Sequence, residues 1–129
     1  MGITKNHIHT QDQINIARLF KALGHPARIA IIENLLMHDN LNCNDLRSYI
    51  QLAQSTISAH IKELHDVGIL AVRVIANNAY YVIHKSTLEQ AADYFQKVFK
   101  KIDEANRPHS PIVYIETAPR IASCNFLSP

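Results

Sequence analysis

The segment 54–84 constrains the fold most, because its hydrophobic period changes once along it, at Gly68. After Gly68 come two β-branched and aromatic runs, ILAVRVIA and AYYVIH. Asn77 and Asn78 join these runs, and both tolerate the left-handed backbone of a type I′ turn. The segment therefore predicts a helix that ends near Gly68, followed directly by a β-hairpin. The helix is indicated by aliphatic residues at the spacing of one helical face: Ile57, Ile61 and Leu64.

Two helices are predicted at the start of the chain by their end signals. Thr10 and Gln13 form a capping box that begins the first helix, and Gly24 ends it. Pro26 suits the first turn of the second helix. The expected apolar residues are Ile14, Ala17, Phe20 and Leu23 in the first helix, and Ile29, Ile32, Leu35 and Leu36 in the second.

A short third helix is expected at 43–50, where it buries Leu46 and Ile50. The tight connection QLA leads from it into the helix at 54–67, whose outer face is polar. Two helices joined in this way form a helix-turn-helix, and the β-hairpin that follows is a wing. The expected fold is therefore mainly α with a β-hairpin wing (α+β), a winged helix-turn-helix.

A long helix is predicted after the hairpin, with Ser86 and Glu89 as its capping box. Its apolar residues repeat with alternating spacings of three and four, which suits packing against another helix, so we expect it to serve both the core and a partner subunit. From Pro108 on, the chain has four prolines and one short alternating run, and this segment is predicted to be an extended tail. We expect a folded domain at 1–107 and a tail at 108–129. The apolar seam consists of Leu88, Ala91, Phe95, Val98 and Ile102, widened by Ala92 and Phe99.

Composition narrows the class of protein. With 47% hydrophobic and 19% charged residues, a packed core is expected. A net charge of +2 means that nucleic-acid binding would need locally clustered cations. Two cysteines do not suggest a disulfide scaffold, and no apolar run resembles a signal core or a membrane span, so a cytoplasmic protein without a membrane partner is expected. An enzyme is not expected, because the histidines lack a nucleophile partner and no Gly-rich phosphate loop is present.

Three segments resemble the ArsR-type winged-helix repressors of bacteria over residues 14–102: LFKALGHPARIAIIENL, DLRSYIQLAQSTISAHIKELHDVGIL and the strand YYVI. The resemblance implies a homodimer formed through the first and last helices. It also implies a sequence-specific repressor that binds double-stranded DNA at an inverted repeat and leaves it when an effector binds; the effector is unknown. The expected dimer contacts are Ile14, Ala17, Leu88, Ala91, Phe95, Val98, Phe99 and Ile102.

The polar face of the helix at 54–67 is the predicted DNA reader, since small hydroxyl side chains let a helix approach the major groove. His60 borders the buried stripe, so a hydrogen-bonded boundary histidine is the alternative to a DNA contact. Ala53 lacks a capping hydroxyl and Arg73 is the only cation of the wing, which keeps open a second function, a protein-interaction module with weak or no DNA binding. The predicted DNA contacts are Gln54, Ser55, Thr56, Ser58, His60, Lys62, Arg73, Asn77 and Asn78. The cations expected nearest DNA are Lys5, Lys21, Arg28, Arg47, Lys62 and Arg73.

Metal binding is not predicted, and neither is a cofactor. Many members of the resembling family bind metal through a Cys-x-Cys just before Asp-Leu, but here Asn42 and Asn44 hold those positions. A second family site uses histidines on the last helix, and this chain has no histidine between His84 and His109. The sequence NCND is better explained by capping, with Asn42 as the cap and Asp45 reaching back to it.

Thiol chemistry remains an alternative at Cys43, because helix N-termini lower the pKa of a thiol. Together with Cys124 in the tail, Cys43 could make the protein a thiol-redox-sensing repressor. An unorthodox metal site of His7, His9 and Cys43 is the remaining option. Inert thiols and solvated histidines are the simpler interpretations.

Overall fold

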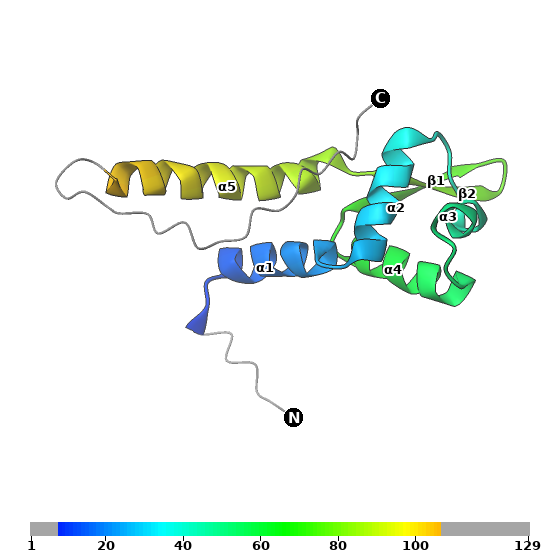
Figure 1. Ribbon diagram of the computed structural model, residues 1–129, viewed down its shortest axis with the longest axis horizontal. Coiled ribbons are helices and arrows are strands. Elements are labelled where there is room, and N and C mark those ends of the chain that lie inside the picture. The colour runs from blue at the N-terminus through cyan, green and yellow to red at the C-terminus, as the bar shows by residue number, and fades with distance from the viewer. Residues whose placement is uncertain (1–7, 107–129) are drawn as a thin grey trace.

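The fold is known from a computed structural model, which describes residues 8–106 of the 129 in the chain. The expected winged helix-turn-helix, mainly α with one β-hairpin, is confirmed (Figure 1). Among the described residues, no helix is both long enough and apolar enough to cross a membrane. The elements in chain order are α1 (Gln11–Leu23), α2 (Pro26–Met37), α3 (Cys43–Ile50), α4 (Gln54–Asp66), β1 (Leu70–Ile75), β2 (Asn78–Ile83) and α5 (Lys85–Ala105).

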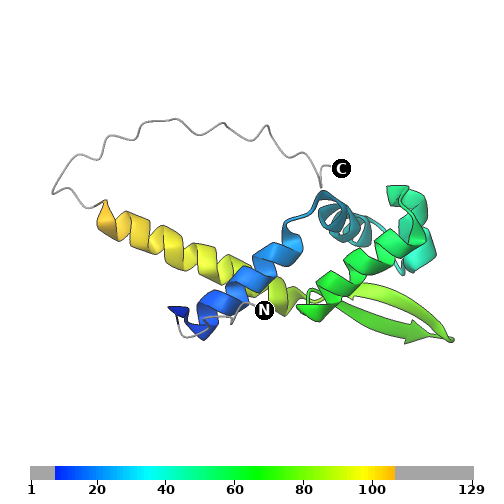
Figure 2. The ribbon, with the colours of Figure 1, turned by 90° about the horizontal axis from the view of Figure 1, so that it is seen from below.

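The helices and the hairpin gather at two ends of the molecule. Figures 1 and 2 show α1 and α5 beside each other at one end, with the outer half of α5 extending past α1. The hairpin, α2, α3 and α4 form the other end. The DNA-reading elements predicted from the sequence are thus separate from the helices predicted to make the dimer.

Capping residues begin the first three helices. The predicted box of Thr10 and Gln13 is confirmed, with the amide of Gln13 donating to Thr10 Oγ1 over 3.1 Å. The box of Asn42 and Asp45 is confirmed as well, with reciprocal bonds of 3.0 and 2.9 Å. The resemblance implied a capping residue just before Pro26, and His25 holds that position, with Nδ1 accepting from the amide of Ala27 over 3.0 Å.

The predicted capping box at the start of α5 is wrong. The helix begins at Lys85 with His84 as its N-cap, and Ser86 Oγ lies 2.8 Å from Nδ1 of His84. The hairpin explains where α5 begins. The amide of His84 still donates to the carbonyl of Ile69 over 2.8 Å, so the hairpin pairing continues to His84 and the helix follows directly after it. The amide of Thr87 then donates to the carbonyl of His84, so the first helical turn already encloses Ser86.

The turn of the wing is also displaced by one residue from the prediction. Its two central residues are Ala76 and Asn77, with φ of 49° and 66°, and Asn78 already belongs to β2. A tertiary bond on the other side of β2, from the amide of Tyr81 to the carbonyl of Leu41 over 3.1 Å, helps to set this register. The register requires a left-handed alanine, which costs about 1 kcal/mol.

The core lies where α1, α2, α3, α4 and the base of the hairpin meet. The predicted stripe of α4 is confirmed as fully inward. In α2 the buried residue is Ile31, whereas the predicted Ile29 and Leu36 are 39% and 57% exposed. Apolar residues occur almost all round α2, so their spacing did not identify the inner face. The buried residues are Leu19, Ala22, Ile31, Leu41, Leu46, Ile57, Ile61, Leu64, Ile69 and Leu70.

Candidate nucleic-acid interface

The helix-turn-helix is made by α3, a short turn and α4. Gln51 ends α3 in the left-handed region at φ 59°, and its amide donates to the carbonyl of Arg47 over 2.9 Å. Ala53 is the N-cap of α4 and, as the sequence predicts, makes no side-chain cap bond. The turn fixes α4 across α3, with the aliphatic stripe of α4 held in the core.

The outer face of α4 carries most of the predicted DNA contacts. Gln54, Ser55 and Thr56 are exposed, and within residues 8–106 their side chains make no hydrogen bond or ion pair. These amide and hydroxyl groups can donate and accept hydrogen bonds, and none of them is used by the described fold. They are therefore available to bind phosphates or base edges. Ser58 is exposed as well, and its hydroxyl lies 3.5 Å from Sγ of Cys43.

Lys62 continues this face but is engaged with its own helix. Its ammonium donates to Asp66 over 2.8 Å, and both side chains are largely exposed. The hydrogen bond to Asp66, with the charge of Asp66, raises the pKa of Lys62. An exposed pair of this kind is weak, so Lys62 can leave Asp66 for a phosphate.

His60, the remaining predicted contact on α4, is held by the fold. Nε of Arg28 donates to Nδ1 of His60 over 3.2 Å, and the ring centroids of His25 and His60 are 4.4 Å apart. Burial, then the nearby charges of His25 and Arg28, lower the pKa of His60. These contacts match the boundary-histidine interpretation. They also engage Arg28, which was expected from the sequence to be a DNA-proximal cation; Lys5, expected there too, lies outside the described residues.

The wing presents an apolar surface with a single cation. Arg73 is exposed on β1 opposite Tyr80, and the tip residues Asn77 and Asn78 are exposed too. Val72 and Val74 are 47% and 68% exposed. These valines were predicted as strand residues, but their exposure was not expected, because the period of a strand does not say whether its outer face is covered.

The face predicted to form a dimer is open in a single chain. None of the 21 residues of α5 is buried, although Leu88 and Ala91 pack against the core. Ile14 and Val98 are half-buried, and Ala17 is exposed. Phe20 of α1 contacts Phe95 at a ring separation of 5.4 Å. The exposed large apolar residues of α5 are Tyr94, Phe95, Phe99 and Ile102.

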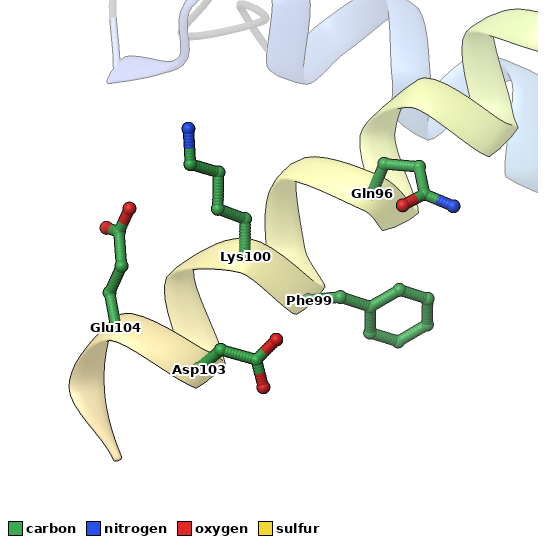
Figure 3. A pocket seen from close by; sticks show the side chains of 5 residues that line it. All are labelled: Gln96, Phe99, Lys100, Asp103 and Glu104. Carbon is green, nitrogen blue, oxygen red and sulfur yellow. The ribbon is translucent and has the colours of Figure 1, made fainter. Parts of the chain in front are cut away.

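The outer half of α5 has a shallow hollow, shown in Figure 3. Gln96, Phe99 and Asp103 point to one side of the helix, and Lys100 and Glu104 to another. All five residues come from α5 alone. The hollow is therefore a feature of one helix surface and does not enclose a ligand.

Comparisons with known proteins agree with this arrangement. The family model described as "Bacterial regulatory protein, arsR family" matches residues 25–72, from the N-cap of α2 into β1. The HTH-type transcriptional regulator YceK of Bacillus subtilis is 31% identical over 81 residues, which are 62% of this chain and 80% of YceK. The chain belongs to the ArsR family. The family consists of DNA-binding transcriptional regulators and not of enzymes, and this ArsR-family chain is a transcriptional regulator of that kind.

Two other relatives extend the match. Regulator Rv0081 of Mycobacterium tuberculosis is 31% identical over 86 residues, 67% of this chain and 75% of Rv0081. Its crystal structure superposes with a TM-score of 0.56 at 26% identity, covering 77% of this chain and all of that one. An ArsR-like regulator from Rhodococcus sp. RHA1 has the same fold, with a TM-score of 0.68 at 17% identity, covering 74% of this chain and 90% of that one.

The metal-binding position of the resembling ArsR proteins is occupied here by a helix cap. Asn42 accepts from the amide of Asp45, so its side chain is already engaged. Among residues 8–106, no three His, Cys, Asp or Glu side chains come together to hold a metal ion. His9 is exposed, and His7, the third member of the unorthodox site with Cys43, lies outside the described residues.

Cys43 is half-buried at the first turn of α3, beside the recognition helix. Its sulfur contacts Ser58 of α4, and burial together with Cys43 raises the pKa of Tyr81 on β2. Cys43 is thus placed where α3, α4 and the hairpin meet. Its predicted redox partner, Cys124, lies outside the described residues, as does the tail at 108–129.

Proposed function

We propose that this ArsR-family regulator is a cytoplasmic, homodimeric repressor that binds double-stranded DNA at an inverted repeat. The observation that carries this proposal is the outer face of α4, where Gln54, Ser55 and Thr56 are exposed and without partners in the described fold. In a helix-turn-helix dimer, two such faces enter successive major grooves about one helical turn apart.

Few cations support this reader, so base contacts carry an unusual share of the binding. Lys62 and Arg73 are the exposed cations of α4 and the wing. Each phosphate contact contributes about −0.9 to the slope of log affinity against log salt concentration. We therefore expect a shallow salt dependence for the specific complex.

The dimer is proposed to form through α1 and α5. Tyr94, Phe95, Phe99 and Ile102 expose a row of large apolar side chains along α5. Contiguous exposed apolar surface of this kind marks a protein interface. The proposed contacts are the eight residues named from the sequence, to which the structure adds Tyr94 through its edge-to-face contact with Phe20.

Release from DNA is proposed to depend on an effector other than a metal at the usual ArsR sites. Asn42 and Asn44 replace thiolates, and amides are poor ligands for soft metals. The engaged side chain of Asn42 supports this proposal, because binding a metal there would break the cap of α3.

Selection of binding sites from random duplex DNA tests the function, run with and without a zinc chelator and with and without an oxidant. We expect an inverted repeat to be enriched under every condition. Gln54→Ala combined with Ser55→Ala should weaken binding to the selected site by about 1–3 kcal/mol for each base that these side chains read. The control Gln11→Ala changes an exposed residue of α1 and should leave the affinity unchanged. Enrichment only when zinc is chelated would contradict the proposed independence from metal.

A second candidate function is a protein-interaction module, which the exposed apolar side chains Val72 and Val74 of the wing favour. The two functions differ in dilute buffer, where electrostatic attraction to DNA is strongest. A dimer that binds no duplex there would be such a module.

A thiol-redox-sensing repressor is the third candidate, favoured by the contact of Cys43 with Ser58. In that case the oxidant would release the wild-type protein from DNA, whereas Cys43→Ser and Cys124→Ser would remain bound. Binding that does not change on oxidation would exclude it.

A further inference from the structure

We propose that His25, Arg28 and His60 form a proton-sensitive tie that positions α4, so that this regulator binds its operator less tightly as the pH falls. The inference rests on the proposed DNA-binding function, and it assigns these residues to positioning the recognition helix and not to contacting DNA. It concerns three residues that the fold brings together at the start of α2.

Arg28 is the centre of the tie. Its Nη1 donates to the carbonyls of Lys21 and Ala22, over 3.3 and 3.2 Å, at the end of α1. Its Nε donates to Nδ1 of His60 on α4, over 3.2 Å. One half-buried guanidinium therefore connects α1, α2 and α4, and the planar geometry of its donors fixes their relative positions.

The hydrogen bonds determine the protonation of both histidines. A guanidinium only donates, so Nδ1 of His60 must accept, which requires a neutral ring with its proton on Nε2. Nδ1 of His25 accepts from the amide of Ala27 over 3.0 Å, so His25 is the same tautomer when neutral. In the folded arrangement, Nδ1 of both adjacent rings therefore serves as an acceptor.

Protonation breaks both contacts. A proton on Nδ1 of His60 would face Nε of Arg28, so that two donors and two positive charges would meet. A proton on Nδ1 of His25 would remove the cap of α2. The two rings lie 4.4 Å apart, so charge on one ring also disfavours charge on the other.

Three charged or titratable groups act on His60. His25 and Arg28 come from the start of α2, and Glu63 comes from α4 itself. Burial, then His25, then Arg28 lower the pKa of His60, and Glu63 opposes them. The neutral state is thus favoured in the fold, and protonation of His60 requires a lower pH than that of an ordinary histidine.

The direction in which DNA affinity changes with pH distinguishes a His60 that positions α4 from a His60 that contacts DNA. If α4 is positioned only while His60 is neutral, the affinity falls about tenfold for each pH unit below the pKa of His60. If His60 instead touched a phosphate, protonation would add a charge-assisted bond, and the affinity would rise.

The test measures the affinity for the selected duplex from about pH 7.5 to about pH 5 at constant salt, covering the titration of histidine. His60→Asn is the matched variant, because its amide oxygen takes the place of Nδ1 and accepts from Arg28 at every pH. His25→Asn likewise retains a good N-cap that does not titrate. We expect the ratio of His60→Asn affinity to wild-type affinity to be near one at neutral pH and to rise in acid, approaching tenfold per pH unit once the pH is below the pKa of His60.

Comparison of variants at the same pH cancels the titration of the other histidines. A ratio that stays constant with pH would overturn the inference, and so would a wild-type affinity that increases relative to His60→Asn in acid. If no duplex binds even at neutral pH, the proposed function is wrong. The proton-sensitive tie can then still be tested by urea unfolding. The wild-type midpoint should then fall more in acid than that of His60→Asn, and parallel curves would refute the tie.

Discussion

At the scale of the residue, Asn42 stands where metal-binding ArsR proteins carry a thiolate, and it does a different task. Its side chain accepts from the amide of Asp45, and the carboxylate of Asp45 accepts in return from the backbone amide of Asn42. Two otherwise unpaired amides at the start of α3 are thereby satisfied. The same four-residue segment that could have held a metal instead stabilises the helix that supports α4.

Replacing this cap should have a measurable cost. Asn42→Ala should lower the free energy of unfolding by about 1 kcal/mol, because an alanine cannot accept from the amide of Asp45. Urea denaturation followed by circular dichroism measures the change. Asn44→Ala is the control, since Asn44 is exposed and its side chain makes no hydrogen bond within residues 8–106. Equal losses for the two variants would show that the cap has no special role.

At the scale of the element, the wing combines a strained tip with a largely apolar surface that carries one cation, Arg73. Ala76 has φ 49°, a region that asparagine and glycine adopt more easily than alanine. The register that demands this conformation is supported away from the tip, where the amide of Tyr81 in β2 donates to the carbonyl of Leu41. The tip therefore accommodates a constraint that arises elsewhere.

Relief of this strain should stabilise the protein. Ala76→Gly should raise the free energy of unfolding, by up to about 1 kcal/mol, because glycine has no Cβ to oppose a left-handed backbone. Thermal unfolding provides the measurement. Ala79→Gly, at an exposed position in β2 with no positive φ, should instead lower stability. A loss at both positions would indicate that the turn does not have this geometry.

At the scale of the whole molecule, the two ends differ in what they leave uncovered. The outer face of α4 exposes polar groups that have no partner within the described residues, whereas α5 exposes large apolar side chains. A single chain fully buries no residue of α5, so its 21 residues would gain most of their tertiary stabilisation from a second chain. Dimerisation and DNA reading are therefore expected to be separable by mutation.

A charged residue on the apolar face of α5 should prevent dimerisation without changing the DNA-reading face. Phe99, 55% exposed, should be buried in the dimer, so Phe99→Glu should shift the protein to a monomer in light scattering after gel filtration. Binding to the inverted repeat should weaken with it, while a single half-site should be bound as before. Val74→Glu, on the exposed surface of the wing, should remain dimeric. A dimeric Phe99→Glu would exclude this part of α5 from the interface.

Local signals in the sequence by themselves determined where most helices begin, which face of α4 is buried and the order of the elements. The boxes at Thr10 and Asn42, the buried stripe of α4 and the order of helices and hairpin could all be predicted, because each depends on residues within a few positions of one another. The polar face of α4 could be predicted as well, because it lies opposite the buried stripe of Ile57, Ile61 and Leu64.

Only the tertiary structure decided the remaining features. The inner face of α2, the register of the wing and the tie between Arg28 and His60 could not be read from local patterns. In the first case apolar residues occurred on every side of the helix, and in the others the deciding hydrogen bonds join residues more than thirty positions apart. Local periodicity says which groups a helix or strand offers, but only packing between distant segments determines which of them meet.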